Sequence, residues 1–370
     1  LVSAFFKGLD VEFFNHHDCH AATAFIGSGF ATCNVLVIDG HGEAETTTYY
    51  QFDQTLGLIR RAESFWPHSL GALYLAATRY LGFDHGDEFK VMGMAAYGVD
   101  RYKDIFDDAI KVSPNGAVTI VGNDFIQINR LSASGHLRVG FTEQLERLVG
   151  ARSDGQSILD THYDFAASIQ ALLERKCVEI VRAGIRATGI RKIVLAGGVA
   201  LNGLMNEKVR TESGVEDIFV YPASSDDGTS VGAAYSSLYK RNQATLRRVP
   251  MRSCFYGPRY NSHEIESCMR HLGVKYTKPI SISDVIADAL VAGKIVARFD
   301  GGSEFGPRAL GNRSILASPL VAEMKNTLNL RIKQRESFRP FAPACLREDV
   351  ERFFELDRDA PFMLLITKAL

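Results

Sequence analysis

The stretch RKIVLAGGVALNGLMNEKV, residues 191–209, decides the fold class. Its apolar run leads into the glycine pair Gly197 and Gly198, and a helical pattern follows the glycines. A second stretch, EDIFVYPASSDDGTSVGAAYSSLYKR at 216–241, repeats this plan with an aspartate pair in the turn. Strands that alternate with helices in this way predict an α/β protein built in layers.

The rest of the chain can be divided by periodicity and composition. ATCNVLVIDGHGE at 31–43 has the pattern of a buried strand that ends in a turn, and the strand KIVARF lies at 294–299. Apolar residues spaced three and four apart predict helices at about 69–81, 164–188, 263–272 and 283–292.

A domain boundary is expected around residues 240–262, where the chain is basic, contains two prolines and lacks periodicity. A chain of 370 residues exceeds what one compact core usually supports. We therefore predict two domains, at 1–250 and 251–370.

The bulk composition excludes some classes of protein. A net charge of −1 gives no electrostatic argument for binding nucleic acid or a membrane, and no apolar run reaches the ~20 residues of a spanning helix. The six cysteines are scattered, which predicts reduced thiols and a cytoplasmic protein. Because the sequence opens on Leu1 and closes on the apolar run PFMLLITKAL, we expect a fragment of a longer protein.

Three histidines lie close together in NHHDCHAATAF, residues 15–25. On a helix, His16 and His20 stand one turn apart on one face and could hold a metal ion, whereas His17 points elsewhere. A polar helix start with Asn15 as its cap explains the same residues. This stretch alone leaves both interpretations open, and a third ligand elsewhere would favour the metal.

Two other turns offer partners for these histidines. Asp226 and Asp227 lie in the turn after a predicted strand, and Asp39 in DGHGE follows another, where it could orient a water, a hydroxyl or a metal ligand. An ordinary cap or β-turn is the commoner explanation of such aspartates. Gly197 and Gly198 would let a phosphate or ribose approach the backbone, although neither a Walker motif nor G-x-G-x-x-G is present.

The second domain carries a local excess of positive charge. Residues 301–340 contain seven basic side chains against three acidic ones. Arg308 and Arg313 lie among Gly, Pro and Ala in FGPRALGNRS rather than on a polar helix face. Because the guanidinium fork suits phosphate and carboxylate, the pattern predicts a pocket for a compact anion. A solvated basic surface is the alternative for the lysines.

Taken together, seven motifs resemble those of the O-carbamoyltransferases. In order they are HHDCHAA, IDGHGE, KVMGMAAYG, AGGVALN, SDDGTSVGAA, GPRALGNRSIL and NLRIKQRESFRPFAP, and they run from residue 16 to 343. The family includes nodulation-factor carbamoyltransferases and enzymes that tailor aminoglycosides, cephamycins, novobiocin and ansamycins. The resemblance implies an actin-like (ASKHA) domain of the threonylcarbamoyl-transferase type, followed by an α+β YrdC-like domain.

The resemblance also implies a reaction and its reactants. The YrdC-like domain would form carbamoyl-adenylate from carbamoyl phosphate and ATP, releasing pyrophosphate, and the first domain would transfer the carbamoyl group to a hydroxyl of a natural product or saccharide. ATP with Mg²⁺ and a divalent metal, Fe²⁺, are the implied cofactors, and a homodimer is a candidate assembly. The family's first strands, with a phosphate loop and a further histidine, and the end of its YrdC-like domain have no counterpart in this sequence.

By similarity, the motif residues take named roles. His16, His20 and Asp226 match the family's metal ligands, and Asp39 its active-site aspartate, a candidate general base together with an unliganded histidine. His16 is counted with Asp39 in the catalytic group. Arg308 and Arg313 are expected to act on carbamoyl phosphate and the adenylate, and the nucleotide-side residues are Lys90, Gly197, Gly198, Asn202, Gly228, Thr229, Lys333, Arg335 and Arg339.

Two other functions compete with this prediction. A threonylcarbamoyl-tRNA enzyme would share the first domain, but the second domain and the lack of a basic RNA-binding face argue against it. A kinase or ATPase of the actin-like fold would explain the glycine turns, but it would leave the His pair and the second domain unexplained.

Overall fold

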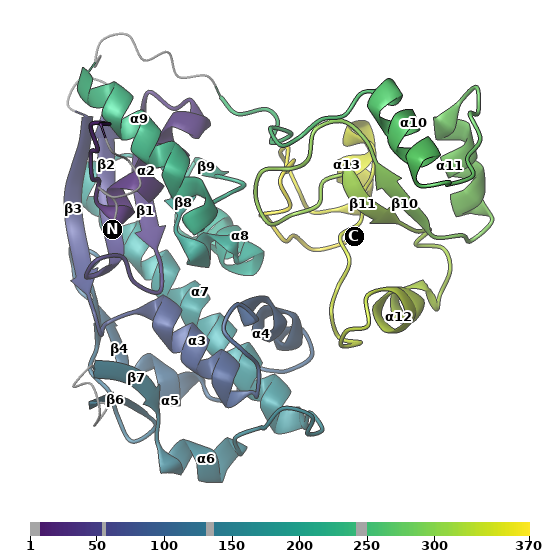
Figure 1. The fold of residues 1–370 in the computed structure, drawn as a ribbon. Coiled ribbons are helices and arrows are strands. Elements are labelled where there is room, and N and C mark those ends of the chain that lie inside the picture. The colour runs from purple at the N-terminus through teal and green to yellow at the C-terminus, as the bar shows by residue number, and fades with distance from the viewer. Residues whose placement is uncertain (1–7, 54–56, 131–136, 242–249) are drawn as a thin grey trace. The chain divides into compact units, whose positions relative to one another are not determined.

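The computed structural model describes residues 8–53, 57–130, 137–241 and 250–370 (Figure 1). The chain divides into two compact units. The first comprises Leu1–Met251 with Leu364–Ile366, and the second comprises Arg252–Met363 with Thr367–Leu370. Residues 242–249, in the segment predicted as a boundary, lie outside the described residues. Among the described residues, no helix combines the length and apolarity needed to cross a membrane.

The first unit is built on a mixed five-stranded sheet. Its strand order is β3-β2-β1-β8-β9, in which β2 runs antiparallel to β1 and β3, whereas β1, β8 and β9 are parallel. The strands are β1 (Thr32–Ile38), β2 (Glu45–Asp53), β3 (Gly57–Phe65), β8 (Lys192–Ala196) and β9 (Asp217–Val220). The parallel strands are connected through helices, which confirms the predicted α/β class.

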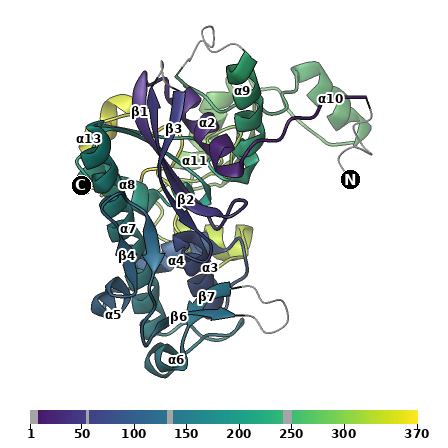
Figure 2. The ribbon, with the colours of Figure 1, turned by 90° about the vertical axis from the view of Figure 1, so that its left-hand side faces the viewer.

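Helices cover both faces of this sheet (Figures 1 and 2). Asn34 of β1 donates to Thr188 Oγ1 at 3.1 Å, at the end of α7 (Asp160–Thr188). Cys33, the neighbour of Asn34, pairs in register with Phe52, whose ring stacks on Phe25 of α2 (His16–Ser28) at 4.1 Å. Because neighbouring side chains of a strand point to opposite faces, α2 and α7 lie on opposite sides of the sheet.

The remaining elements of the first unit surround this layer. The helices are α3 (Leu70–Tyr80), α4 (Glu88–Ala95), α5 (Lys103–Asp107), α6 (Glu143–Val149), α8 (Gly203–Glu212) and α9 (Thr229–Arg241). Two small hairpins precede α7, one of β4 (Ile110–Val112) with β5 (Val118–Ile120) and one of β6 (Ile126–Arg130) with β7 (Leu137–Phe141). The predicted helices at 69–81 and 164–188 are confirmed, although α7 begins four residues earlier.

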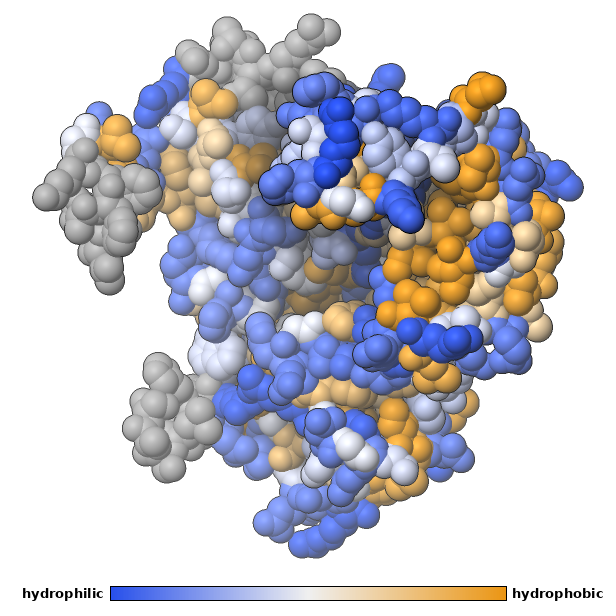
Figure 3. Space-filling view, turned by 45° about the vertical axis from the view of Figure 1, so that its right-hand side comes forward, coloured by the Kyte–Doolittle hydropathy of each residue, from blue (hydrophilic) through white to orange (hydrophobic). Residues whose placement is uncertain are grey.

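The second unit has a smaller core. Its regular elements are α10 (Ser262–His271), α11 (Ile282–Val291), β10 (Val296–Phe299), β11 (Arg313–Leu316), α12 (Met324–Thr327) and α13 (Val350–Phe353). The predicted helices of this part of the chain are therefore confirmed. Neither α10 nor α11 buries a residue, and hydrophobic side chains gather on the surface of this unit (Figure 3). Its buried apolar residues are Cys254, Met324, Leu328, Phe338 and Phe362.

Gly184 sets the distance between α7 and the sheet. A Cβ at this position would lie 1.8 Å from Cζ of Tyr49 on β2. Tyr49 is only 1% exposed, so its ring has no free space into which it could move. The helix can pack on the sheet only because residue 184 has no side chain.

We expect Gly184→Ala to lower the free energy of unfolding by about 2 kcal/mol, since overpacking outweighs the gain of about 1 kcal/mol in helix propensity. Urea unfolding measures the difference. Gly140→Ala is the matched control, because a Cβ there would have no neighbour within 4 Å. Equal stability of the two variants would contradict the packing argument.

Candidate metal centre

The two imidazoles predicted to share a helix face do so. Asn15 is the N-cap of α2, and its Oδ1 accepts a hydrogen bond from the backbone N–H of Asp18 at 3.2 Å. The predicted cap is therefore confirmed. One helical turn brings His16 and His20 together, with their Nε2 atoms 3.0 Å apart. The His20 side chain is buried, whereas that of His16 is 24% exposed.

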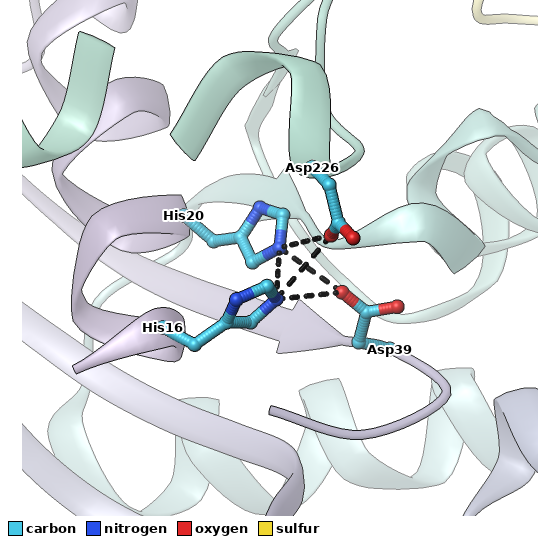
Figure 4. Close-up of side chains that lie close together, drawn as sticks. All are labelled: His16, His20, Asp39 and Asp226. Carbon is cyan, nitrogen blue, oxygen red and sulfur yellow. Dashed lines mark hydrogen bonds and ion pairs between the residues drawn. The ribbon is translucent and has the colours of Figure 1, made fainter. Parts of the chain in front are cut away.

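Two aspartates from separate turns complete the group (Figure 4). Asp39 follows β1, and its Oδ2 lies 3.0 Å from His20 Nε2 and 3.4 Å from His16 Nε2. Asp226 opens the turn after β9, and its Oδ1 lies 3.3 Å from His16 Nε2 and 3.5 Å from His20 Nε2. The structure thus brings together residues that are 210 positions apart in the sequence.

The donor set fits a divalent transition metal. One atom from each of the four residues lies within 4.8 Å of all the others. Imidazole nitrogens and carboxylate oxygens are common ligands of such ions. Bonds of about 2.0 Å in a tetrahedral site place ligand atoms about 3.3 Å apart, close to the separations seen here. Asp39, predicted as the active-site aspartate, belongs to the same group as the three predicted ligands.

The charges of the group favour an ionised Asp39. Burial disfavours the charged carboxylate, but hydrogen bonds from His16 and His20 outweigh it and hold the pKa of Asp39 well below its usual range. Burial likewise disfavours the charged form of His20, yet Asp226 and Asp39 raise the pKa of this imidazole to about 9. In the metal-free group the two carboxylates therefore hold a proton on His20, and a bound cation would take the place of that proton.

Close backbone packing places Asp226 in this group. A Cβ at Gly232 of α9 would lie 1.9 Å from the backbone oxygen of Cys19 on α2. Thr23 Oγ1 bonds the carbonyl oxygen of Gly228 at 2.8 Å, which ties α2 to the turn itself. Thr229 Oγ1 donates to the carbonyl oxygen of Asp226 at 2.7 Å. In this structure Gly228 and Thr229 thus shape the turn that carries Asp226.

The AGGVALN turn lies beside the same group. Gly197 has φ +84°, and a Cβ there would lie 2.2 Å from the backbone oxygen of Ile38, so this position requires glycine. A Cβ at Gly198 would lie 3.2 Å from Oδ1 of Asp39. Gly198 therefore borders the carboxylate, whereas Asn202 is buried, caps α8 and bonds Gln170.

Two other predicted residues of the first unit make local contacts. Lys90 pairs with Asp87 at 3.0 Å and lies over the ring of Phe83. His17 is fully buried and its Nδ1 bonds Thr48 Oγ1 at 2.7 Å. As predicted, the His17 ring is not among the four grouped side chains.

In the second unit, the Arg313 side chain stabilises the loop that precedes it through hydrogen bonds to backbone carbonyls. Its guanidinium donates to the backbone carbonyls of Asp300, Asn312, Pro258 and Gly301, at 2.6 to 3.2 Å. It also stacks on Phe299, with Cζ 3.7 Å from the ring centroid. These contacts occupy the guanidinium and give Arg313 a structural role.

The other predicted basic residues of the second unit differ in burial and in their contacts. Burial lowers the pKa of Arg308, which is half-buried in the loop. Arg335 donates to the buried Asn329 at 2.7 Å and lies over Phe341. Lys333 is exposed, and Arg339 lies 3.7 Å from Glu336.

Sequence reasoning missed the carboxylate that organises the loop around Arg308. Glu304 Oε1 accepts backbone N–H bonds from Leu310, Asn312 and Arg313, at 2.8, 2.9 and 3.3 Å. An acidic residue just before a glycine-rich basic stretch was the available signal.

These features define an α/β protein with a candidate two-histidine, two-aspartate metal centre. The chain matches the Carbamoyltransferase N-terminus family over residues 4–235 and the Carbamoyltransferase C-terminus family over residues 287–370. It belongs to the carbamoyltransferase family.

Individual relatives agree with this assignment. The nodulation protein NolO of Bradyrhizobium diazoefficiens is 38% identical over 96% of this chain and 63% of its own length. Protein sll1178 of Synechocystis is 37% identical over 97% of the chain and 59% of its own length. The chain thus spans about 60% of the length of these curated relatives. The crystal structure of HypF from T. kodakarensis covers 68% of this chain and 39% of its own, with 17% identity and a TM-score of 0.33, a likeness too low to bear on function.

We expect the substitutions His20→Ala and Asp39→Ala each to weaken Co²⁺ binding at least about 100-fold, because each removes one of four converging donors. Isothermal titration of the metal-free protein measures the affinity. His85→Ala, which changes an exposed histidine outside the group, is the control. Unchanged affinity in the first two variants would contradict the metal centre.

Proposed function

We propose that the protein is an ATP-dependent O-carbamoyltransferase that acts on a hydroxyl of a natural product or saccharide. The observation that carries this proposal is the convergence of His16, His20, Asp39 and Asp226 within 4.8 Å in a chain of the carbamoyltransferase family. The match of residues 287–370 to the Carbamoyltransferase C-terminus family supports a catalytic role for the second unit as well.

The first reaction would take place on the second unit. Carbamoyl phosphate, ATP and one water would give carbamoyl-adenylate, phosphate and pyrophosphate, so that the carbamoyl group gains AMP as its leaving group. Arg308 is a candidate to bind the anionic reactants, because it places a half-buried guanidinium in the glycine-rich loop of the segment that matches the Carbamoyltransferase C-terminus family. Lys333, Arg335 and Arg339 remain candidates for contacts with the phosphates, and Mg²⁺ would accompany ATP.

The second reaction would take place at the metal centre of the first unit. The acceptor hydroxyl would attack the carbamoyl carbon, its proton would pass to a base, and AMP would leave. His16, His20, Asp39 and Asp226 would hold a divalent ion, for which we propose Fe²⁺. When bound, such an ion would polarise the carbamoyl oxygen.

Within this scheme, Asp39 is better suited to holding a cation than to taking the proton. Its lowered pKa makes it a weak base, and its Oδ2 faces both imidazoles. Gly198 leaves space beside its other oxygen, where the nucleotide or carbamoyl group could approach. The proposed nucleotide-side residues of the first unit stay Lys90, Gly197, Gly198, Asn202, Gly228 and Thr229. Lys90, Asn202 and Thr229 also make the local contacts described above.

The proposal also covers the cellular compartment and the oligomeric state. All six cysteines are free thiols, which supports a cytoplasmic protein. A homodimer stays a prediction, and the acceptor is proposed only as a class, a hydroxylated natural product or saccharide. A kinase of the same fold is the second candidate, but it gives no role to the His pair.

The function can be tested by incubating the protein with ATP, carbamoyl phosphate and a panel of hydroxylated acceptors. Release of pyrophosphate together with a carbamoylated acceptor would support the proposal. Release of ADP without pyrophosphate would favour a kinase. No pyrophosphate with any acceptor would contradict the carbamoyl-adenylate route.

The two loop arginines should respond differently to substitution. We expect Arg308→Met to slow pyrophosphate release about 100-fold, because a half-buried cationic donor to the reactants is lost. Arg313→Met should instead lower the free energy of unfolding by about 2 kcal/mol, because four carbonyls lose a charged donor.

The exposed Arg347 of the same unit provides the control, as Arg347→Met removes a surface ion pair with Asp359. Pyrophosphate release and urea unfolding are measured for all three variants. The distinction fails if Arg308→Met destabilises the protein as much as Arg313→Met does.

A further inference from the structure

The first turn of α2 is held by a carboxylate from a neighbouring loop. Backbone N–H groups in the first turn of a helix have no partner within the helix. The N–H of His16 meets this need by donating to both carboxylate oxygens of Glu43, at 3.1 Å each. A carboxylate at this end of a helix is also favoured by the helix dipole.

Further hydrogen bonds extend this contact to both sides of the turn. Asn15 Nδ2 donates to Glu43 Oε2 at 2.8 Å, and Asn15 Oδ1 accepts from Arg60 Nη2 at 2.6 Å. Arg60 Nη2 lies 2.8 Å from Asp18 Oδ1, which also accepts from the Tyr50 hydroxyl at 2.9 Å. The first turn of α2 is thereby attached to β2, β3 and the loop that carries Glu43.

Glu43 lies on the loop that also supplies Asp39. Two backbone hydrogen bonds fix this loop to β2: Asp39 N donates to Thr46 O at 2.9 Å, and Gly42 N donates to Glu45 O at 2.7 Å. A Cβ at Gly42 would lie 3.3 Å from Cβ of His16, so the loop lies directly against the helix. One short loop therefore contributes an aspartate to the centre and holds the helix that contributes both histidines.

The two histidines differ in how much support they need. His20 lies one turn inside the helix and its side chain is 1% exposed, so the surrounding core fixes its ring. His16 is the first helical residue and its side chain is 24% exposed. Because helix ends fray, a ligand at this position depends on contacts from outside the helix.

We propose that Glu43 is a positioning residue of the metal centre, one that holds His16 in the orientation required for binding the ion. Its negative charge beside His16 also favours a bound cation. The proposal rests on the metal centre proposed above. Partners that orient a ligand from outside the coordination sphere typically change metal affinity 10–100-fold when they are removed.

The test uses Co²⁺, which is followed by its visible absorption during titration of the metal-free protein. Glu43→Ala should weaken the affinity about tenfold and shift the absorption band, because His16 is no longer held. Glu43→Gln keeps an acceptor for the His16 N–H and should lose less affinity. Recovery in this conservative variant would identify the hydrogen bond as the cause.

Glu63→Gln is the matched control. Glu63 pairs with the same Arg60 at 2.5 Å, yet among the described residues it makes no hydrogen bond to α2. Its substitution removes a charge from the same network and should leave Co²⁺ affinity unchanged. Circular dichroism of each metal-free variant verifies that the fold is retained.

The outcomes separate this proposal from the one on which it rests. Wild-type affinity and spectrum in Glu43→Ala would overturn the positioning role and leave the metal centre intact. An equal loss in Glu63→Gln would also overturn it, because the effect would then come from the charge of the network. Absence of Co²⁺ binding by the unchanged protein would contradict the metal centre and the positioning role together.

Discussion

The candidate centre depends on the parallel pairing of β1, β8 and β9. Parallel strands end at one edge of a sheet, and loops at the carboxyl ends of such strands form the usual ligand crevice of α/β folds. Asp39 follows β1, Gly197 and Gly198 follow β8, and Asp226 follows β9. The sheet thus places three separate turns side by side, and α2 adds the two imidazoles from the face that it covers.

Close packing of the surrounding backbone then brings the side chains of the centre to within a few ångströms of one another. Gly232 allows α9 to approach the backbone of α2, and Gly197 allows the turn after β8 to approach β1. In each case the adjacent backbone occupies the space of a side chain, so these glycines are explained without any ligand. The same contacts that stabilise the unit therefore determine the separations between Asp39, Asp226 and the histidines.

Much of this could be predicted from the sequence, and the limits have physical causes. Periodicity located the long helices, and spacing placed His16 and His20 on one face. The aspartates were found as turn residues, but their distances depend on strand pairing, which spacing along the chain does not determine. Arg313 shows another limit, because composition cannot distinguish a guanidinium that binds a ligand from one that binds backbone carbonyls.

The four side chains of the centre differ in solvent exposure, because they lie at different depths in the fold. His20 is 1% exposed, Asp39 15%, His16 24% and Asp226 73%. The group is therefore closed by the core behind His20 and open on the side of Asp226. A buried donor resists displacement because its neighbours are packed, whereas an exposed one can move when another group approaches. Since solvent reaches the group from the open side, we expect Asp226 to be the least rigid of the four donors, and His20 together with Asp39 to form the fixed part of the group.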